Sequence, residues 1–149
     1  MRALTGDGVN DPQTLQVDTF YRGMSKNNNA TVVTVTDSAG GVHEDVDQLA
    51  GRVLETATYL GNGGPVDHST ISSYWVSEPT ASRSRDGLPA LTARWVAPVL
   101  SFSRQAVTGT GSTTWRYTAT DNAYDTSATS ATVGVLKHSY SHTVPATTA

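Results

Sequence analysis

The chain has 149 residues, of which 37% are hydrophobic and only 15% are charged, and it contains no cysteine. A length of this order fits one domain or a piece of a larger protein. The formal net charge of -3 leaves no basic surplus to neutralise phosphates, which argues against a nucleic-acid partner. The absence of cysteine excludes disulfides, thiolate catalysis and cysteine-ligated zinc.

The composition favours extended β structure with a thin core. Thr and Ser together make up about a quarter of the chain, and there are 13 Gly. Thr is β-branched and favours strands, whereas Gly and Ser favour turns. There is no apolar run of about 18 residues, so no membrane span is expected, and no apolar segment typical of a signal peptide. If the protein works outside the cell, this chain is therefore either part of a longer exported one or leaves by another route.

In chain order, the pattern begins with a loose segment and continues as hairpins. Residues 1–16 contain Gly, Asn, Asp and Pro, so we expect a loose N-terminal segment there. Residues 15–24 then alternate as a strand does. Further hairpins or alternating runs are predicted over residues 31–46, 53–73, 86–107 and 113–126. No segment of useful length has helical periodicity, although "DQLAGR" allows one helical turn before Gly51 stops it.

The alternation divides each run into two faces, and the last part of the chain loses it. In the second hairpin, Val53, Glu55 and Ala57 face one way, and Leu54 and Thr56 face the other. After Tyr124-Asp125 the sequence becomes Ser/Thr/Ala-rich. We therefore expect a repeat-like β domain over residues 17–126 and a poorly ordered tail over residues 127–149, apart from a short strand at 132–136.

A succession of short stretches resembles the Rhs/YD-repeat proteins of actinobacteria. These stretches are "FYRGM", "VTVTDSAGGVHED", "AGRVLETATYLGNGGPV", "TISSYWVSEPTASRSRDGLPAL", "SRQAV" and "TTWRYTATDNAYD". They arrive in that order and cover about residues 17–126. Tyr124-Asp125 is the only Tyr-Asp pair, so the chain is more similar to the region that leads into the repeats than to the repeats themselves.

The resemblance implies a fold and a role. Members of this family form a continuous β-sheet that spirals into a hollow shell, which encloses a C-terminal toxin in some of them. It implies that this chain is an all-β antiparallel meander of hairpins, structural and not an enzyme, and without a cofactor. Its expected partners are the remaining repeats of a longer chain or an encapsulated toxin domain. Its expected place is extracellular or at the cell surface, as part of that exported chain.

Three groups of residues suggest chemistry but fall short of a site. His43 and Asp45 would share a strand face, yet two ligands are too few for structural zinc. Asp67-His68-Ser69 contains the residue types of a hydrolase triad, but neighbours on a strand face opposite sides. His138 and His142 have the spacing of a metal pair on a helix, in a Ser-rich stretch that favours no helix. We therefore predict neither catalytic nor metal-binding residues.

Trp75, Trp95 and Trp115 recur at an interval of twenty residues. One interpretation is that they are structural anchors on successive β units, because Trp buries a large area. The alternative is a row of aromatic platforms, which would make this chain a carbohydrate-binding or adhesive β module with polysaccharide as its partner. The second interpretation requires at least two of the three rings to be exposed and roughly coplanar.

Overall fold

The computed structural model describes residues 1–24, 32–108, 113–127 and 129–144. The segments between the predicted runs at 25–31 and 109–112, with the first residue of the predicted hairpin over 31–46, and the end of the expected tail lie outside the described residues. Eleven strands and one short 3-10 turn (η1, Asp47–Leu49) make up the regular structure of the described part. The strands are β1 (Arg2–Thr5), β2 (Thr14–Phe20), β3 (Thr34–Thr36), β4 (Val42–Glu44), β5 (Val53–Tyr59), β6 (Val66–Val76), β7 (Ala81–Arg85), β8 (Leu88–Ala93), β9 (Val96–Thr108), β10 (Thr113–Tyr124) and β11 (Leu136–Val144).

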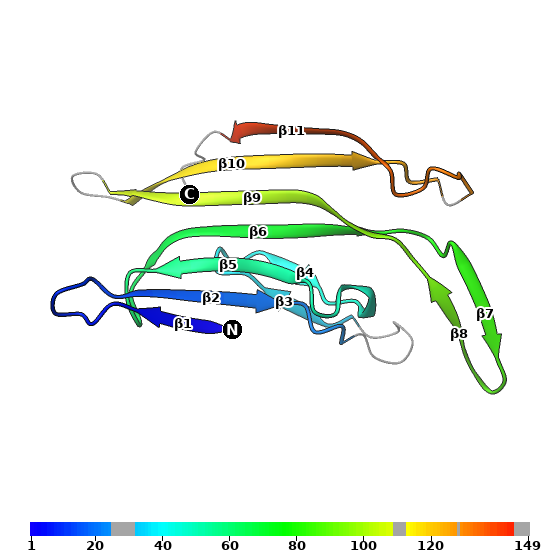
Figure 1. The fold of residues 1–149 in the computed structure, drawn as a ribbon, viewed down its shortest axis with the longest axis horizontal. Helices are drawn as coiled ribbons and strands as arrows, with labels where there is room; N and C mark the ends of the chain where they lie inside the picture. Colours follow the sequence, from blue (N-terminus) through cyan, green and yellow to red (C-terminus); the bar gives the residue numbers. More distant parts are fainter. Residues whose placement is uncertain (25–31, 109–112, 128, 145–149) are drawn as a thin grey trace.

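Seven of these strands form one antiparallel sheet in the order β1-β2-β5-β6-β9-β10-β11. Each strand pairs with the next sheet strand along the chain, which confirms the predicted all-β antiparallel meander (Figure 1). Within the described ranges no helix is long and apolar enough to cross a membrane. The predicted helical turn before Gly51 is η1, and Gly51 follows it with a φ of 77°.

Two hairpins interrupt the meander and lie outside the main sheet. The β3–β4 hairpin connects β2 to β5, and the β7–β8 hairpin connects β6 to β9. Both begin at the same end of the sheet, but they go different ways (Figure 1). The β3–β4 hairpin returns along β5, whereas the β7–β8 hairpin projects beyond the end of the sheet. Every residue of β7 and β8 is exposed.

Strand register gives the main sheet two different faces, because residues paired across strands share a face. One face, here called the polar face, carries three cross-strand rows of polar side chains. The first row is Asp18, Thr56, Thr70, Ser103, Thr118 and Thr143. The second is Ser72, Ser101, Thr120 and Ser141. The third is Gln16, Thr58, His68, Gln105 and Arg116.

The opposite face, here called the covered face, holds the core where the β3–β4 hairpin lies on it. Its cross-strand rows include Ala57–Ser69–Arg104–Tyr117 and Glu55–Ile71–Phe102–Ala119. Tyr21, Leu49, Leu54 and Ile71 form the buried cluster. Val35 and Val46, from the hairpin and the segment after it, pack against that cluster. The core is thin because only one face of the sheet is apolar, and it is apolar over only part of its width.

A β-bulge gives the Leu54 side chain a different orientation from the one that the alternation predicts. The alternation placed Leu54 opposite Glu55, but both side chains are buried, and Leu54 is 0% exposed. In the β2–β5 register Thr19 pairs with Glu55 and Phe20 with Val53, so Leu54 is the extra residue. An extra residue breaks the two-residue period and re-aims the side chains around it. The bulge thereby brings Leu54 into the core beside a buried carboxylate.

The two ends of the chain also differ from the sequence expectation. Residues 1–16, expected to be loose, include β1, which pairs with β2 from Arg2↔Val17 to Thr5↔Thr14. The expected tail includes β11, a nine-residue strand that pairs with β10 along Tyr117–Tyr124. The expected short strand at 132–136 is instead mostly turn before β11. Low complexity did not prevent a strand here, because Ser, Thr, His and Tyr alternate well enough to pair with an existing edge.

Candidate functional site

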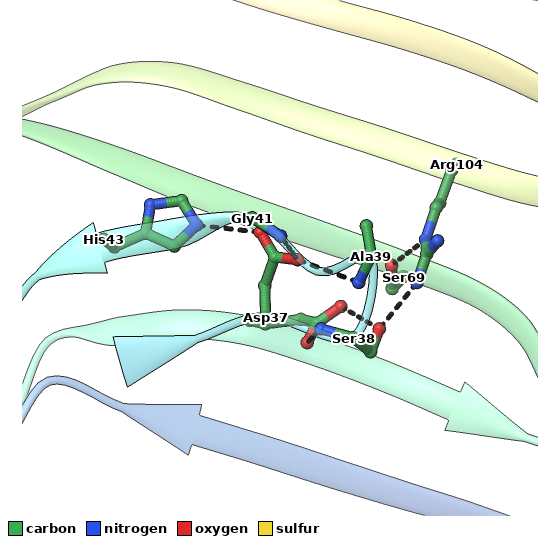
Figure 2. A network of polar contacts seen from close by, with 8 residues as sticks. Asp37, Ser38, Ala39, Gly41, His43, Ser69 and Arg104 are labelled. Atoms are coloured by element: carbon green, nitrogen blue, oxygen red, sulfur yellow. Dashed lines mark hydrogen bonds and ion pairs between the residues drawn. The ribbon is translucent and has the colours of Figure 1, made fainter. Parts of the chain in front are cut away.

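A network of polar contacts joins the β3–β4 hairpin to the covered face of the sheet (Figure 2). We call it the latch. Its residues are Asp37, Ser38, His43, Glu55, Ser69 and Arg104. The turn between β3 and β4 supplies Asp37 and Ser38, and β4 supplies His43. Strands β5, β6 and β9 supply the other three, so the latch ties four segments together.

Asp37 shapes the turn from within. Its Oδ1 accepts hydrogen bonds from the backbone amides of Ala39 (2.8 Å) and Gly41 (2.9 Å), and its Oδ2 lies 2.7 Å from His43 Nε2. Burial by itself would raise the pKa of Asp37, but these hydrogen bonds outweigh it and hold the pKa below its ordinary value. A Cβ on Gly41 would collide with the Asp37 carboxylate. The sequence "DSAGG" thus forms an aspartate-capped turn in which the Asp37 carboxylate fills the space beside Gly41.

Ser38 connects the turn to two buried charges. Its backbone amide donates to Glu55 Oε2 at 2.8 Å, and its hydroxyl donates to Glu55 Oε1. The same hydroxyl oxygen accepts a hydrogen bond of 2.7 Å from Arg104 Nη2. Glu55 is 3% exposed and Arg104 is 9% exposed, so both charges are held away from water. Ser38 therefore bridges a carboxylate and a guanidinium that would each be costly to bury alone.

Arg104 is held on its remaining sides by the sheet. Its Nε donates to Ser69 Oγ at 2.9 Å, and its guanidinium lies 4.7 Å from the centre of the Trp115 ring. This is a cation–π contact in a site with little access to water, where such contacts are strongest. The planar guanidinium suits this role, because it donates in its plane and stacks through its faces.

Ser38 and His43, the serine and the histidine of the hairpin side of the latch, have separate hydrogen-bond partners. A serine–histidine pair of the hydrolase type needs the imidazole within hydrogen-bond reach of the hydroxyl. In the latch the Ser38 hydroxyl is engaged by Glu55 and Arg104, and His43 is engaged by Asp37 through Nε2. The Ser38 hydroxyl is thus bonded to a carboxylate and a guanidinium, and it is not paired with the His43 imidazole. Among the residues that the structure describes, no group of three or more His, Cys, Asp or Glu side chains could hold a metal ion.

The three histidine-containing groups singled out in the sequence have other contacts. Asp45 accepts hydrogen bonds of 2.8 Å from the backbone amides of Arg22 and Gly23, so it fixes the chain after β2. His138 and His142 lie on β11 with the Tyr140 ring stacked between them, at centroid distances of 6.3 and 5.4 Å. His138, Tyr140 and His142 therefore form a stack of three rings on one strand.

The prediction that Asp67 and His68 face opposite sides was wrong. His68 Nδ1 lies 3.0 Å from Asp67 Oδ2. In the β5–β6 register Tyr59 pairs with Val66 and Thr58 with His68, which leaves Asp67 as the extra residue of a bulge. Ser69 remains on the other face, where it is 1% exposed and bonds to Arg104. No triad is assembled by this segment.

The three tryptophans do not form one row. Trp75 pairs with Ala97 and Trp115 with Ala106, nine positions apart along β9, which at about 3.3 Å per residue separates them by roughly 30 Å. Trp75 stacks on Tyr124 with 12° between the ring planes. Trp95, near Trp75 at the start of β9, is 50% exposed and packs on Gly134. Trp115 is half-buried against Arg104.

Sequence reasoning singled out neither Glu55 nor Arg104, which are the centre of the latch. The available signal was a charge on a face otherwise formed by apolar or small residues: Glu55 between Val53 and Ala57, and Arg104 after Leu100 and Phe102. A charge at such a position predicts a buried partner, but the partner cannot be chosen from the sequence, because Ser38 is 66 residues away from Arg104.

Comparisons with known proteins identified no relative of this chain. No protein-family model, no curated protein and no solved structure matches the chain.

Proposed function

We propose that this chain is a non-catalytic structural segment of a longer β-sheet, of the kind expected for an Rhs/YD-repeat shell or another cell-surface or toxin-delivery protein. The observation that carries the proposal is the pair of open sheet edges. Strand β11 ends the sheet on one side and β1 on the other, and each has a partner on one side only in the described part of the chain. Open edges are templates for further strands.

The dimensions of the β11 edge favour continuation of the sheet. All of β11 except Val144 is exposed, and β11 presents nine residues of backbone. Natural proteins usually protect such an edge by shortening it, by adding lysine or proline, or by covering it. Here the strand has one Lys, at position 137, and no proline. A plain meander also extends simply, because each added strand is stabilised mainly by its neighbour.

Under this proposal the partners are further strands of the same longer chain, and a toxin domain where such a chain encloses one. The location would be extracellular or at the cell surface. The latch has a structural role in this setting, since it holds a hairpin over the thin core where the sheet by itself would leave apolar surface open to water.

The test is edge-dependent self-association of the isolated chain. We expect sedimentation velocity to show association that rises with concentration. Replacing His138, Tyr140 and His142 together by Lys should return the protein to a monomer, because charges on an edge strand oppose strand addition. The matched control places Lys at Leu88 and Leu91 on the projecting β8, where association should persist.

Two outcomes would contradict the proposal. One is a folded chain that stays monomeric at every concentration. The other is association that survives the β11 substitutions but disappears with those on β8, which would make the projecting hairpin the contact.

A second candidate function is a carbohydrate-binding or adhesive module. The observation in its favour is Trp95, which is 50% exposed at the end of the sheet near Trp75. A polysaccharide that is bound by Trp75, Trp95 and Trp115 together should protect tryptophan fluorescence from quenching by acrylamide. Trp95→Ala should abolish this protection. If no polysaccharide tested changes the tryptophan emission or its quenching in the wild type, this second function is contradicted.

A further inference from the structure

The polar face contains a shallow cavity that none of the roles above uses. Its volume is about 320 Å³, and it lies on strands β6, β9 and β10. Its lining includes six polar-face residues: His68, Thr70, Ser103, Gln105, Arg116 and Thr118. They come from two adjacent rows of the face, so the cavity is a widening in an ordered array of hydrogen-bonding groups.

The donors in this cavity are available for a ligand. Within the part of the chain that the structure describes, no hydrogen bond or ion pair engages Gln105, Arg116 or Thr118. All three are exposed. Thr70 and Ser103 share one hydrogen bond of 2.9 Å between their hydroxyls, which leaves one hydroxyl hydrogen and several lone pairs free. A guanidinium, an amide and hydroxyls thus face the same small space.

The charge around the cavity selects an anionic group. Arg116 is the one arginine whose side chain the register places on the polar face of the described sheet. The carboxylate of Asp67, which precedes the lining residue His68 in the sequence, lies 3.0 Å from the His68 ring. The carboxylate of Asp18 accepts a hydrogen bond from Thr56, at the far end of its row. A guanidinium binds a carboxylate through two parallel hydrogen bonds.

The rest of the lining selects a polyhydroxylated ligand. Rows of hydroxyls and amides spaced by about 4.8 Å between strands, and by about 6.7 Å along them, can exchange hydrogen bonds with sugar hydroxyls. The first row continues on both sides of the cavity, to Thr56 and to Thr143, and the third continues to Thr58 and Gln16 on one side, which suits a linear chain better than a compact molecule. A nucleic acid is disfavoured, because its binding depends on many phosphate contacts, whereas this lining offers one arginine among hydroxyls and amides in a chain of net charge -3.

We propose that this cavity is a binding site for an acidic polysaccharide, with Arg116 holding a uronate carboxylate and Gln105, Thr118, Thr70 and Ser103 holding ring hydroxyls. The rigid, hydrogen-bonded strands preorganise these groups, which lowers the ordering cost of binding. The site is independent of the open edges and of the tryptophans, because it uses one face of the sheet and none of those residues.

The experiment uses the full 149-residue chain, labelled with ¹⁵N, and titrates it with trigalacturonate while amide chemical shifts are recorded. We expect saturable shifts centred on residues 68–70, 103–105 and 116–118. Arg116→Gln should weaken binding about tenfold or more, and Arg116→Lys should fall between the two, because lysine keeps the charge but loses the paired hydrogen bonds. Neutral galactotriose should bind at least about tenfold more weakly than trigalacturonate.

The matched control is Arg83→Gln on the projecting β7, which should bind as the wild type does. The proposal is overturned if trigalacturonate produces no saturable shifts, or if the shifts centre on β11 and the covered face. It is equally overturned if Arg116→Gln and Arg83→Gln bind alike, or if galactotriose binds as tightly as trigalacturonate. Unchanged spectra of the free variants establish that the exposed substitutions leave the fold intact.

Discussion

The two hairpins that leave the sheet are built from similar strand and turn signals, yet they have opposite fates. The β3–β4 hairpin returns over the covered face, and the latch and the core cluster hold it there. The β7–β8 hairpin stays fully exposed, including Leu88 and Leu91 at 61% and 53%. The comparison indicates that the strand and turn pattern of a hairpin specifies only its local pairing. Whether the hairpin docks depends on the side chains of the sheet beneath it.

The sheet beneath β3–β4 presents buried side chains that bond to that hairpin, whereas the β7–β8 hairpin contacts the rest of the chain at its base. Under β3–β4, Glu55 and Arg104 are buried and need Ser38 for their hydrogen bonds. The β7–β8 hairpin has its own internal contacts, such as Arg85 Nε to the Pro89 carbonyl at 2.8 Å. Its attachment is through its base, where Arg94 donates to the Ser77 carbonyl at 2.6 Å. We therefore call the β7–β8 hairpin the arm and expect that its removal costs the sheet little.

The largest expected effect comes from removing each hairpin in turn. Replacing residues 34–44 by a Gly/Ser linker should abolish cooperative thermal unfolding, because it uncovers the core and leaves two buried charges without their bridge. Replacing residues 81–92 by Asn-Gly, which makes a two-residue turn between Thr80 and Ala93, should leave the transition almost unchanged. Circular dichroism on heating measures both. A loss of the transition in the second variant would mean that the arm is part of the folding unit.

The next effect compares one leucine beneath the docked hairpin with one on the arm. Leu54→Ala should lower the free energy of unfolding by about 3 to 5 kcal/mol, because Leu54 is fully buried and leaves a cavity. Leu91→Ala should change it by less than about 0.5 kcal/mol. Urea unfolding followed by tryptophan fluorescence gives both values. Equal losses would show that the arm packs against something in solution.

A smaller effect should follow from the arginines. Arg104→Met keeps much of the side-chain volume but removes the hydrogen bonds to Ser38 and Ser69, and we expect a loss of about 2 to 3 kcal/mol. Arg83→Met on β7 should be neutral within about 0.5 kcal/mol. Equilibrium unfolding in urea compares them. A neutral Arg104→Met would mean that the latch accompanies docking without stabilising it.

The smallest effect is a pH dependence that only the docked hairpin should show. The lowered pKa of Asp37 means that its ionised form stabilises the fold at pH values above the unfolded pKa of 3.8, and that this contribution is lost as the pH falls through the folded pKa. The stability gap between wild type and Asp37→Asn should therefore be larger at about pH 6 than at about pH 3. Asp86→Asn, in the turn of the arm, is the control. A gap that is the same at both pH values would contradict the role of the carboxylate.

Local sequence patterns are sufficient to predict the β class, the β3–β4 and β5–β6 hairpins and the turns within them. Alternation over residues 53–59 and 66–73 separated by "GNGGP" leaves little choice but a hairpin, because only glycine readily adopts the positive φ of Gly61 and Gly63. Leu100, Phe102 and Arg104 also alternate in the sequence, and the register places all three on one face of the sheet. These features depend on near neighbours, which a sequence shows directly.

Tertiary structure alone decided which face is covered, which hairpin docks and where the bulges fall. The bulges at Leu54 and Asp67 shift the alternation by one residue and depend on the partner strand. The latch joins Ser38 to Arg104 across 66 positions, and the polar rows join strands from β2 to β11. Burial, register and charge pairing at such separations are properties of the assembled sheet, because no short stretch of sequence contains both partners.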